Sequence, residues 1–190
     1  MKLATLALAL GLTSPAFAST AFSVDFEKAW DYGQAVDNTY AASGVSFTNV
    51  LGLSNDADFT YFSGAPSPMG VAFVQLDGVV NTAAYMNVAG GVSGALSFFA
   101  STTADFEVKA YSGLNGTGTL LGSFLVAANT TDFSVWTPNV FSFNGVAQSF
   151  DLSGANGVAG LDNISAVPEP TSLALLLGGA TLLLARRRRG

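Results

Sequence analysis

The sequence has 190 residues and contains no cysteine and no histidine. Without cysteine no disulfide can link parts of the fold, so stability has to come from packing and from any bound cation. Without histidine the chain lacks the commonest general base and zinc ligand, and all Ser-His-Asp and Cys-His mechanisms are excluded. Most familiar hydrolase mechanisms are therefore unavailable to this protein.

Positive charge is also scarce, with 7 Lys and Arg residues in the whole chain. Between residues 19 and 166 the only basic residues are Lys28 and Lys109, and they stand against twelve acidic residues. A surface this acidic repels phosphate backbones and offers no electrostatic footprint for nucleic acid. Binding of DNA or RNA is therefore not expected.

Residues 1–18 have the features of a secretory signal peptide. Lys2 supplies a charged start, residues 3–12 are apolar, and Ala16-Phe17-Ala18 is a small-x-small cleavage site. The sequence therefore predicts that the protein is exported and that the mature chain begins at Ser19.

The other end of the chain, residues 167–190, has three ordered parts. It begins with a Pro-Glu-Pro sequence, continues with the uncharged residues 171–185, and ends in four arginines. Fifteen helical residues span about 22 Å at about 1.5 Å each, and arginines at one end can reach the headgroups and fix that end in the cytoplasm. We therefore expect a short single transmembrane helix, with membrane-orienting residues Arg186, Arg187, Arg188 and Arg189.

This tripartite tail resembles the PEP-CTERM sorting signal of exported proteins of Gram-negative bacteria. The resemblance rests on Val167, Pro168, Glu169 and Pro170, the apolar segment and the arginine cluster. It implies that the tail is recognised by exosortase, a membrane-embedded transpeptidase-like enzyme, and cut near the motif. The partner implied is thus an exosortase-like enzyme, and the implied location is the membrane, then the cell surface or the medium.

The body, residues 19–166, consists of short stretches that alternate between apolar and polar residues. In Phe106–Tyr111, for example, Glu107, Lys109 and Tyr111 are predicted to face water while the residues between them face a core. Turn sequences separate these stretches, for example Asn115-Gly116 and Asn144-Gly145. The pattern predicts an all-β fold, an antiparallel β-sandwich. The predicted strands are 44–50, 71–76, 95–100, 106–111, 120–126, 133–136, 140–143, 148–152 and 161–166.

Three short sequences in the body resemble the jelly-roll β-sandwiches of PEP-CTERM proteins and, more distantly, carbohydrate-binding modules. They are Val24–Glu27, Lys109–Gly122 and Leu161–Ile164. Asp25 and Glu27 stand two residues apart, so in a strand both carboxylates lie on the same face. If the first and last strands are neighbours, Asp162 joins them, and three carboxylates are an oxygen ligand set that suits calcium. Related carbohydrate-binding sandwiches often hold a structural calcium at positions like Glu27 and Asp162. The alternative is that these acids are solvated residues on strand faces.

Several aromatic residues could stack on sugar rings, whose C–H faces pack on aromatic faces. The strongest candidates are Trp30, Tyr32 and Trp136; Tyr40, Tyr61 and Tyr85 belong to the same set. Packing in the core is the alternative for each of them.

The sequence leaves three functions open. The favoured one is an exported, non-catalytic surface or matrix protein linked to exopolysaccharide or biofilm. The second is a carbohydrate-binding module. The third is a secreted polysaccharide hydrolase, for which acid pairs such as Asp105 and Glu107 are available, although any acidic strand offers such a pair.

Overall fold

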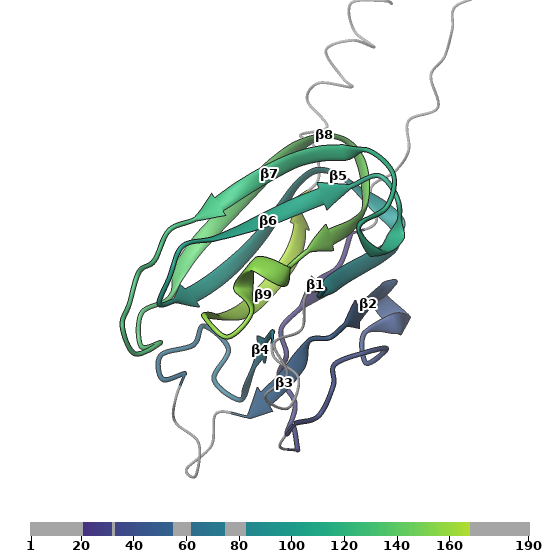
Figure 1. Ribbon diagram of the computed structural model, residues 1–190. Helices are drawn as coiled ribbons and strands as arrows, with labels where there is room; N and C mark the ends of the chain where they lie inside the picture. The colour runs from purple at the N-terminus through teal and green to yellow at the C-terminus, as the bar shows by residue number, and fades with distance from the viewer. Residues whose placement is uncertain (1–20, 32, 55–61, 75–82, 168–190) are drawn as a thin grey trace, which may run out of the picture.

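The computed structural model describes residues 21–31, 33–54, 62–74 and 83–167, and this part of the chain is all-β (Figure 1). All of its strand pairs are antiparallel. The strands are β1 Ser23–Val24, β2 Val45–Thr48, β3 Leu51–Ser54, β4 Gly70–Phe73, β5 Tyr85–Thr102, β6 Phe106–Tyr111, β7 Leu120–Val126, β8 Thr137–Asp151 and β9 Ala159–Val167. Short 3₁₀ helices are η1 Ala41–Ser43, η2 Leu114–Gly116 and η3 Ser153–Ala155.

Two layers share the long strands β5 and β8 (Figure 1). In the first layer the order is β7–β6–β8–β5–β2, formed by the C-terminal part of β8 and the N-terminal part of β5. In the second layer the order is β3–β4–β9–β5–β8, and β1 also pairs with β9. The predicted antiparallel β-sandwich is confirmed at this level.

Both shared strands bend where they pass between the layers. The pairing of β5 with β8 shifts register at two places, between Asn87 and Val92 and between Ser93 and Ala95. Gly91, Gly94 and Gly145 have φ values of 73°, 94° and 94°. Glycine adopts such values readily because it has no Cβ. The turn predicted at Asn144-Gly145 was therefore wrong: it is a bend within β8.

Several predicted strand boundaries were correct and others were not. Strands 106–111 and 120–126 are exact, predicted strand 140–143 lies within β8, and predicted strand 148–152 runs one residue past the end of β8, to Leu152. β5 begins at Tyr85 rather than Ala95, and β3 was not predicted. No strand forms at 133–136, where Phe133 has a left-handed φ of 58° that interrupts extended backbone.

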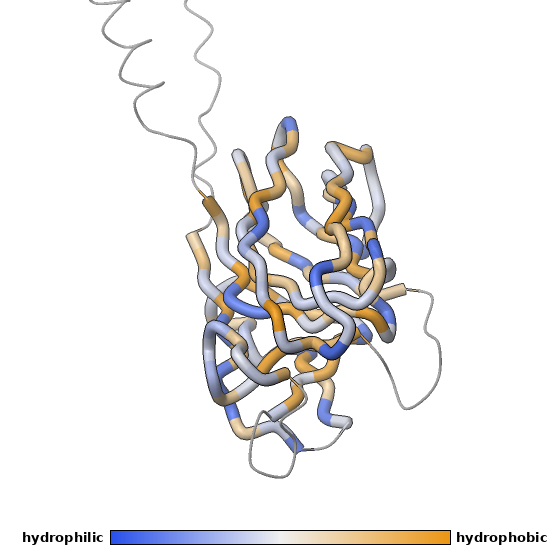
Figure 2. Tube along the Cα trace, turned by 90° about the vertical axis from the view of Figure 1, so that its left-hand side faces the viewer, coloured by the Kyte–Doolittle hydropathy of each residue, from blue (hydrophilic) through white to orange (hydrophobic). Residues whose placement is uncertain are grey.

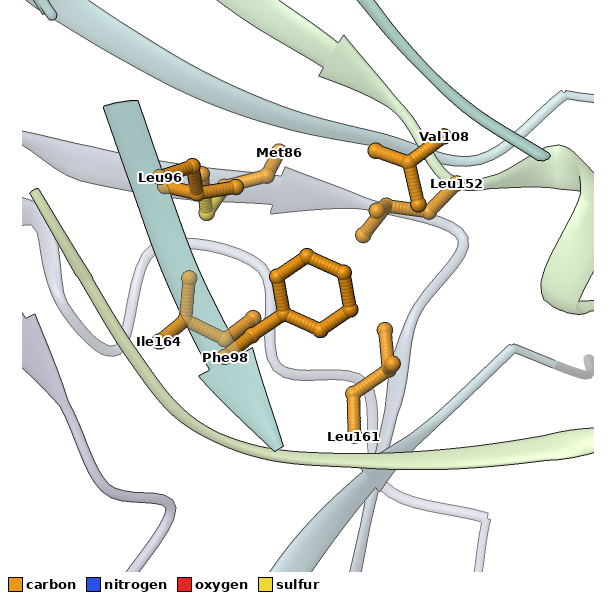
Figure 3. Close-up of a pocket in the computed structure, with 7 residues that line it drawn as sticks. All are labelled: Met86, Leu96, Phe98, Val108, Leu152, Leu161 and Ile164. Carbon is orange, nitrogen blue, oxygen red and sulfur yellow. The ribbon is translucent and has the colours of Figure 1, made fainter. Parts of the chain in front are cut away.

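Hydrophobic and hydrophilic residues follow each other in short stretches along the chain, as an alternating strand pattern requires (Figure 2). The apolar residues of the two layers meet in one core. The core contains a cavity of about 10 Å³, whose apolar lining side chains point toward one another (Figure 3). At this size the cavity holds about one water at most, so it is a packing gap. It is lined by Met86, Leu96, Phe98, Val108, Leu152, Leu161 and Ile164.

Both predicted processing segments lie largely outside the described residues. These include the signal peptide, the motif residues Pro168, Glu169 and Pro170, the apolar segment 171–185 and the four arginines. In the described part of the chain, no helix is long and apolar enough to cross a membrane. Val167 is described: it is the last residue of β9 and is 37% exposed.

Candidate functional site

The predicted acidic cluster lies where the first and last strands meet. β1 pairs with β9, as expected, with Val24 opposite Ile164. β1 ends at Val24, however, because Phe26 has a φ of 54°, which interrupts the extended backbone. The prediction that Asp25 and Glu27 share one face of a continuous strand is therefore wrong.

Two carboxylates of this cluster hold the segment before β4. Asp162 is fully buried, and its Oδ1 and Oδ2 accept hydrogen bonds from the hydroxyl and backbone N–H of Ser67, at 2.6 and 2.9 Å. Glu27 Oε1 accepts backbone N–H groups of Met69 and Gly70, at 2.7 and 3.2 Å. The Asp25 carboxylate accepts the N–H of Glu27. These side chains thus stabilise the approach of the chain to β4.

Burial is the main cause of the pKa shifts in and beside this cluster. It raises the pKa of Asp162 to about 6, and the charge of Glu27 adds to the rise, whereas hydrogen bonds from Ser67 and Asn163 oppose it. Burial, followed by the charge of Asp25, raises the pKa of the nearby Tyr40 to about 12. Among the described residues, no three acidic side chains are grouped as a metal site requires. Calcium binding by Asp25, Glu27 and Asp162 stays a prediction.

Trp30 is a core residue and is only 6% exposed. Its Nε1 donates to the carbonyl of Phe26 at 2.9 Å, and Lys28 Nζ lies 4.6 Å from the ring centroid. A Cβ added at Gly52 would lie 2.0 Å from the ring, so the ring rests directly on that backbone. The prediction that Trp30 offers a free stacking face was wrong, because the glycines of β3 and β4 make room to bury it.

Trp136 is half-buried on the outer side of the second layer. Its ring centroid lies 6.1 Å from that of Phe62, and its edge covers Gly160. It therefore belongs to a satellite aromatic cluster. Tyr32 and Tyr61 lie outside the described residues, and the half-buried Tyr40 contacts the rings of Phe26 and Phe47.

The first layer carries polar side chains on its outer face. Strand register places one row across all five strands, and each member stands opposite the next: Ser123, Lys109, Asp151, Tyr85 and Thr48. Four spacings of ~4.8 Å make this row about 19 Å long. The second row lies two residues along each strand, or three on β7 because of a register shift, and comprises Leu120, Tyr111, Ser149, Asn87 and Ser46. We call these two rows, with Glu107, the polar face.

The direction of these side chains follows from strand alternation. Ala110, Phe150 and Met86 lie between members of the two rows on their strands, and all three are buried in the core. Their sequence neighbours must therefore point to the other side of the sheet. Tyr85 and Tyr111 are half-buried on that side, so each presents an aromatic surface beside polar groups.

The polar face ends in a hollow of about 530 Å³ between two turns. Ser46, Thr48 and Asn87 contribute from β2 and β5, while Asn115 comes from η2. On the opposite side, Asp37 and Asn38 precede η1. The polar lining residues all carry hydroxyl, amide or carboxylate groups, which suit a ligand rich in hydroxyls.

Reciprocal hydrogen bonds fix the η2 wall of this hollow. The Asn87 side-chain amide donates to the side-chain oxygen of Asn115, and the backbone N–H of Asn115 donates back to Asn87, both at 2.8 Å. The hydroxyl of Ser149 donates to the carbonyl of Gly113 and accepts the N–H of Gly116. The wall is thus held in place before any ligand arrives, which limits the ordering cost of binding.

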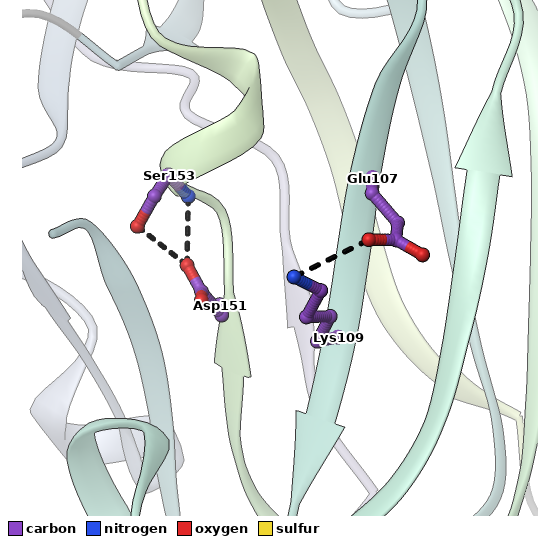
Figure 4. A network of polar contacts seen from close by, with 4 residues as sticks. All are labelled: Glu107, Lys109, Asp151 and Ser153. Carbon is purple, nitrogen blue, oxygen red and sulfur yellow. Dashed lines mark hydrogen bonds and ion pairs between the residues drawn. The ribbon is translucent and has the colours of Figure 1, made fainter. Parts of the chain in front are cut away.

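Charged groups of the polar face are tied to neighbouring groups (Figure 4). Lys109 Nζ lies 3.3 Å from Glu107, and Asp151 accepts the N–H and hydroxyl of Ser153. A hydrogen bond from Ser123, followed by Lys109, holds the pKa of Glu107 below its ordinary value. Burial, followed by the charge of Asp151, raises the pKa of Tyr85, which stays a neutral phenol at physiological pH.

Only part of this site could be predicted from the sequence. The water-facing positions of Glu107, Lys109 and Tyr111 were correct, since a clear alternation marks that strand. Tyr85 was named among the aromatic candidates without a location. Asn87, Asn115 and Asn38 were missed, because only strand pairing and the two turns bring them together.

No known protein family matches this chain, and no curated protein does. Among solved structures it is similar to the K2 cleaved adhesin domain of Lys-gingipain, with a TM-score of 0.50 and 15% identity over 77% of this chain and 99% of that domain. At this identity the similarity shows the fold alone: an antiparallel β-sandwich.

Carbohydrate-binding modules are matched with lower scores. A family 6 module matches with a TM-score of 0.44 and 13% identity, over 82% of this chain and 100% of the module. The module from Cellvibrio mixtus lichenase 5A, in complex with cellotriose, has a TM-score of 0.43 and 9% identity, over 66% of this chain and 91% of that one. These scores are too low to transfer a ligand, so any function has to be argued from the polar face.

Proposed function

We propose that the protein is an exported, non-catalytic β-sandwich that binds polysaccharide on its polar face. One observation carries this proposal: two rows, made mostly of hydroxyl, amide and tyrosine side chains, cross five strands and end in a hollow whose η2 wall is fixed. The rows also contain Lys109, Asp151 and Leu120. Ser149 and Asn87 are buried and hold η2 in place. Tyr85 and Tyr111 supply stacking surface, while Ser46, Thr48 and Asn115 supply hydrogen-bond partners. A row of about 19 Å suits a stretch of several sugar units.

A binding role fits the acidic groups of the described chain better than a hydrolytic one. A glycosidase needs one carboxyl group with a raised pKa beside its substrate. Asp162 has a raised pKa, but it is fully buried. On the polar face the pKa of Glu107 is lowered instead. The proposal therefore assigns no catalytic residue.

Delivery to the cell surface is the second part of the proposal. The signal peptide would lead the chain through the inner membrane, and the PEP-CTERM-like tail would hold it there for an exosortase-like enzyme. Polysaccharide binding would then retain the released protein in the exopolysaccharide or biofilm around the cell. The mass of the mature exported protein tests this part: it should start at Ser19 and lack residues beyond the Pro-Glu-Pro motif. A mature protein that keeps all four arginines would contradict tail cleavage.

Affinity electrophoresis through gels that contain single polysaccharides tests the binding part. We expect at least one polysaccharide to retard the wild-type protein, and Tyr111→Ala to weaken that binding about tenfold through loss of stacking surface. Phe99→Ala is the matched control, since Phe99 is a half-buried aromatic residue outside the polar face.

Thermal melts establish that each variant is folded before its binding is compared. Equal loss of binding in Tyr111→Ala and Phe99→Ala would place the site elsewhere. A folded wild-type protein that no polysaccharide retards, including the exopolysaccharide of the producing cell, would refute the proposed function.

A further inference from the structure

Acidic side chains outnumber basic ones around the polar face. Glu107 and Asp151 lie on its strands and Asp37 lines the hollow, while Lys109 is the cation of the face and is paired with Glu107. The other basic residue of the described chain, Lys28, lies over the ring of Trp30. Within the described residues, no unpaired cation is therefore at hand to receive an anionic ligand.

We infer, on the basis of the proposed function, that the polar face binds uncharged polysaccharides and discriminates against polyuronates and other polyanionic chains. A uronate needs cations or several converging donors for each carboxylate. Here it would meet the carboxylates of Asp37 and Asp151, and like charges brought together across an interface oppose binding.

The neutral groups of the hollow are matched to sugar hydroxyls. The side chains of Asn38, Ser46 and Thr48 can each donate and accept, as a hydroxyl does. A hydroxyl can therefore pair with them in either direction, whereas a carboxylate only accepts. The hollow thus offers a neutral chain more complete hydrogen bonding than it offers an anionic one.

Pairs of polysaccharides that share a backbone and differ in charge test the inference with the full-length protein. The probes are hydroxyethylcellulose against carboxymethylcellulose, and fully methyl-esterified against de-esterified polygalacturonate. At low salt we expect the neutral member of any pair that binds to be preferred about tenfold. The preference should shrink at high salt, because ions screen the repulsion.

A charge-neutralised variant tests whether the carboxylates around the polar face cause the preference for the neutral polysaccharide. Asp37→Asn, Glu107→Gln and Asp151→Asn together leave Lys109 as the charge of the face, so the preference for the neutral member should fall to about twofold or less. Asparagine tolerates the left-handed φ of 40° at position 37, so Asp37→Asn alone serves if the triple variant does not fold. It should reduce the preference in the same direction.

The matched control removes three negative charges elsewhere, by Asp31→Asn, Asp105→Asn and Asp132→Asn. This variant should keep the wild-type preference. If it loses the preference as the first variant does, net charge and not the polar face discriminates, and the inference is overturned. Wild-type binding of the anionic member as tightly as the neutral one also overturns it but leaves the proposed function standing. Binding to none of the probes or other polysaccharides refutes both.

Discussion

The buried carboxyl of Asp162 should make the protein more stable in mild acid than at neutral pH. Its pKa is about 6 in the folded protein and 3.8 as an ordinary aspartate. The folded state therefore binds more protons than the unfolded state between these values. The stabilisation is complete below pH 3.8 and is lost as the pH rises through 6.

The magnitude follows from the two pKa values. A difference of about 2 units at ~1.4 kcal/mol each gives a loss of roughly 3 kcal/mol between about pH 4 and pH 7. Geometry explains why a proton is favoured. The single hydroxyl proton of Ser67 has two acceptors, Asp25 O at 2.7 Å and Asp162 Oδ1 at 2.6 Å. A proton on Asp162 lets that carboxyl donate to the Ser67 hydroxyl while the hydroxyl donates to the backbone carbonyl of Asp25.

Urea unfolding at a series of pH values, with EDTA present, measures this effect. The background is favourable because the chain has no histidine, the side chain that ordinarily titrates between pH 5 and 8. Asp162→Asn keeps an acceptor oxygen but cannot ionise, so its stability should change much less over this range. Asp132→Asn is the control, because Asp132 is exposed and its pKa is lowered by hydrogen bonds, first from Ser134. Identical pH dependence in wild type and Asp162→Asn would refute the reasoning.

Three further predictions concern the cation, the core and the hollow. If Asp162 and its neighbours hold calcium, EDTA should lower the melting temperature by several degrees, because a ligand of the folded state stabilises it; an unchanged melt removes that hypothesis. Gly52→Ala should lower the free energy of unfolding in urea by about 2–3 kcal/mol, because the new methyl group meets the Trp30 ring. The control is Gly157→Asn, since a Cβ at Gly157 meets nothing within 4 Å; a loss at Gly52 no larger than the loss at Gly157 would contradict this packing. Asn115→Ala should be about 1 kcal/mol less stable than Asn115→Gly, since both lose the amide but only alanine strains the φ of 54°; equal stabilities would show that the turn relaxes.

Local patterns predicted those strands whose residues obey a simple rule. Apolar and polar residues alternate regularly in Phe106–Tyr111, and the predicted bounds were exact because one face of the strand is buried and the other faces solvent. Tyr85–Gly94 was missed since it is half of a strand that bends between layers, so its pattern changes with each register shift. Phe133–Trp136 has the composition of a strand, but Phe133 and Trp136 pack into a satellite cluster from irregular backbone.

The sequence by itself determined the all-β class, the acidic body, and the exclusion of disulfides and histidine chemistry, because these depend on composition and on the period of two along a strand. Its two ends predict export and sorting for the same reason: charge and hydropathy act locally there. Tertiary structure alone decided that Trp30 is buried, that Asp162 holds Ser67, and that Asn87 meets Asn115. These outcomes depend on which distant segments pair and bend together, and contacts between residues far apart in the chain are not written in any local pattern.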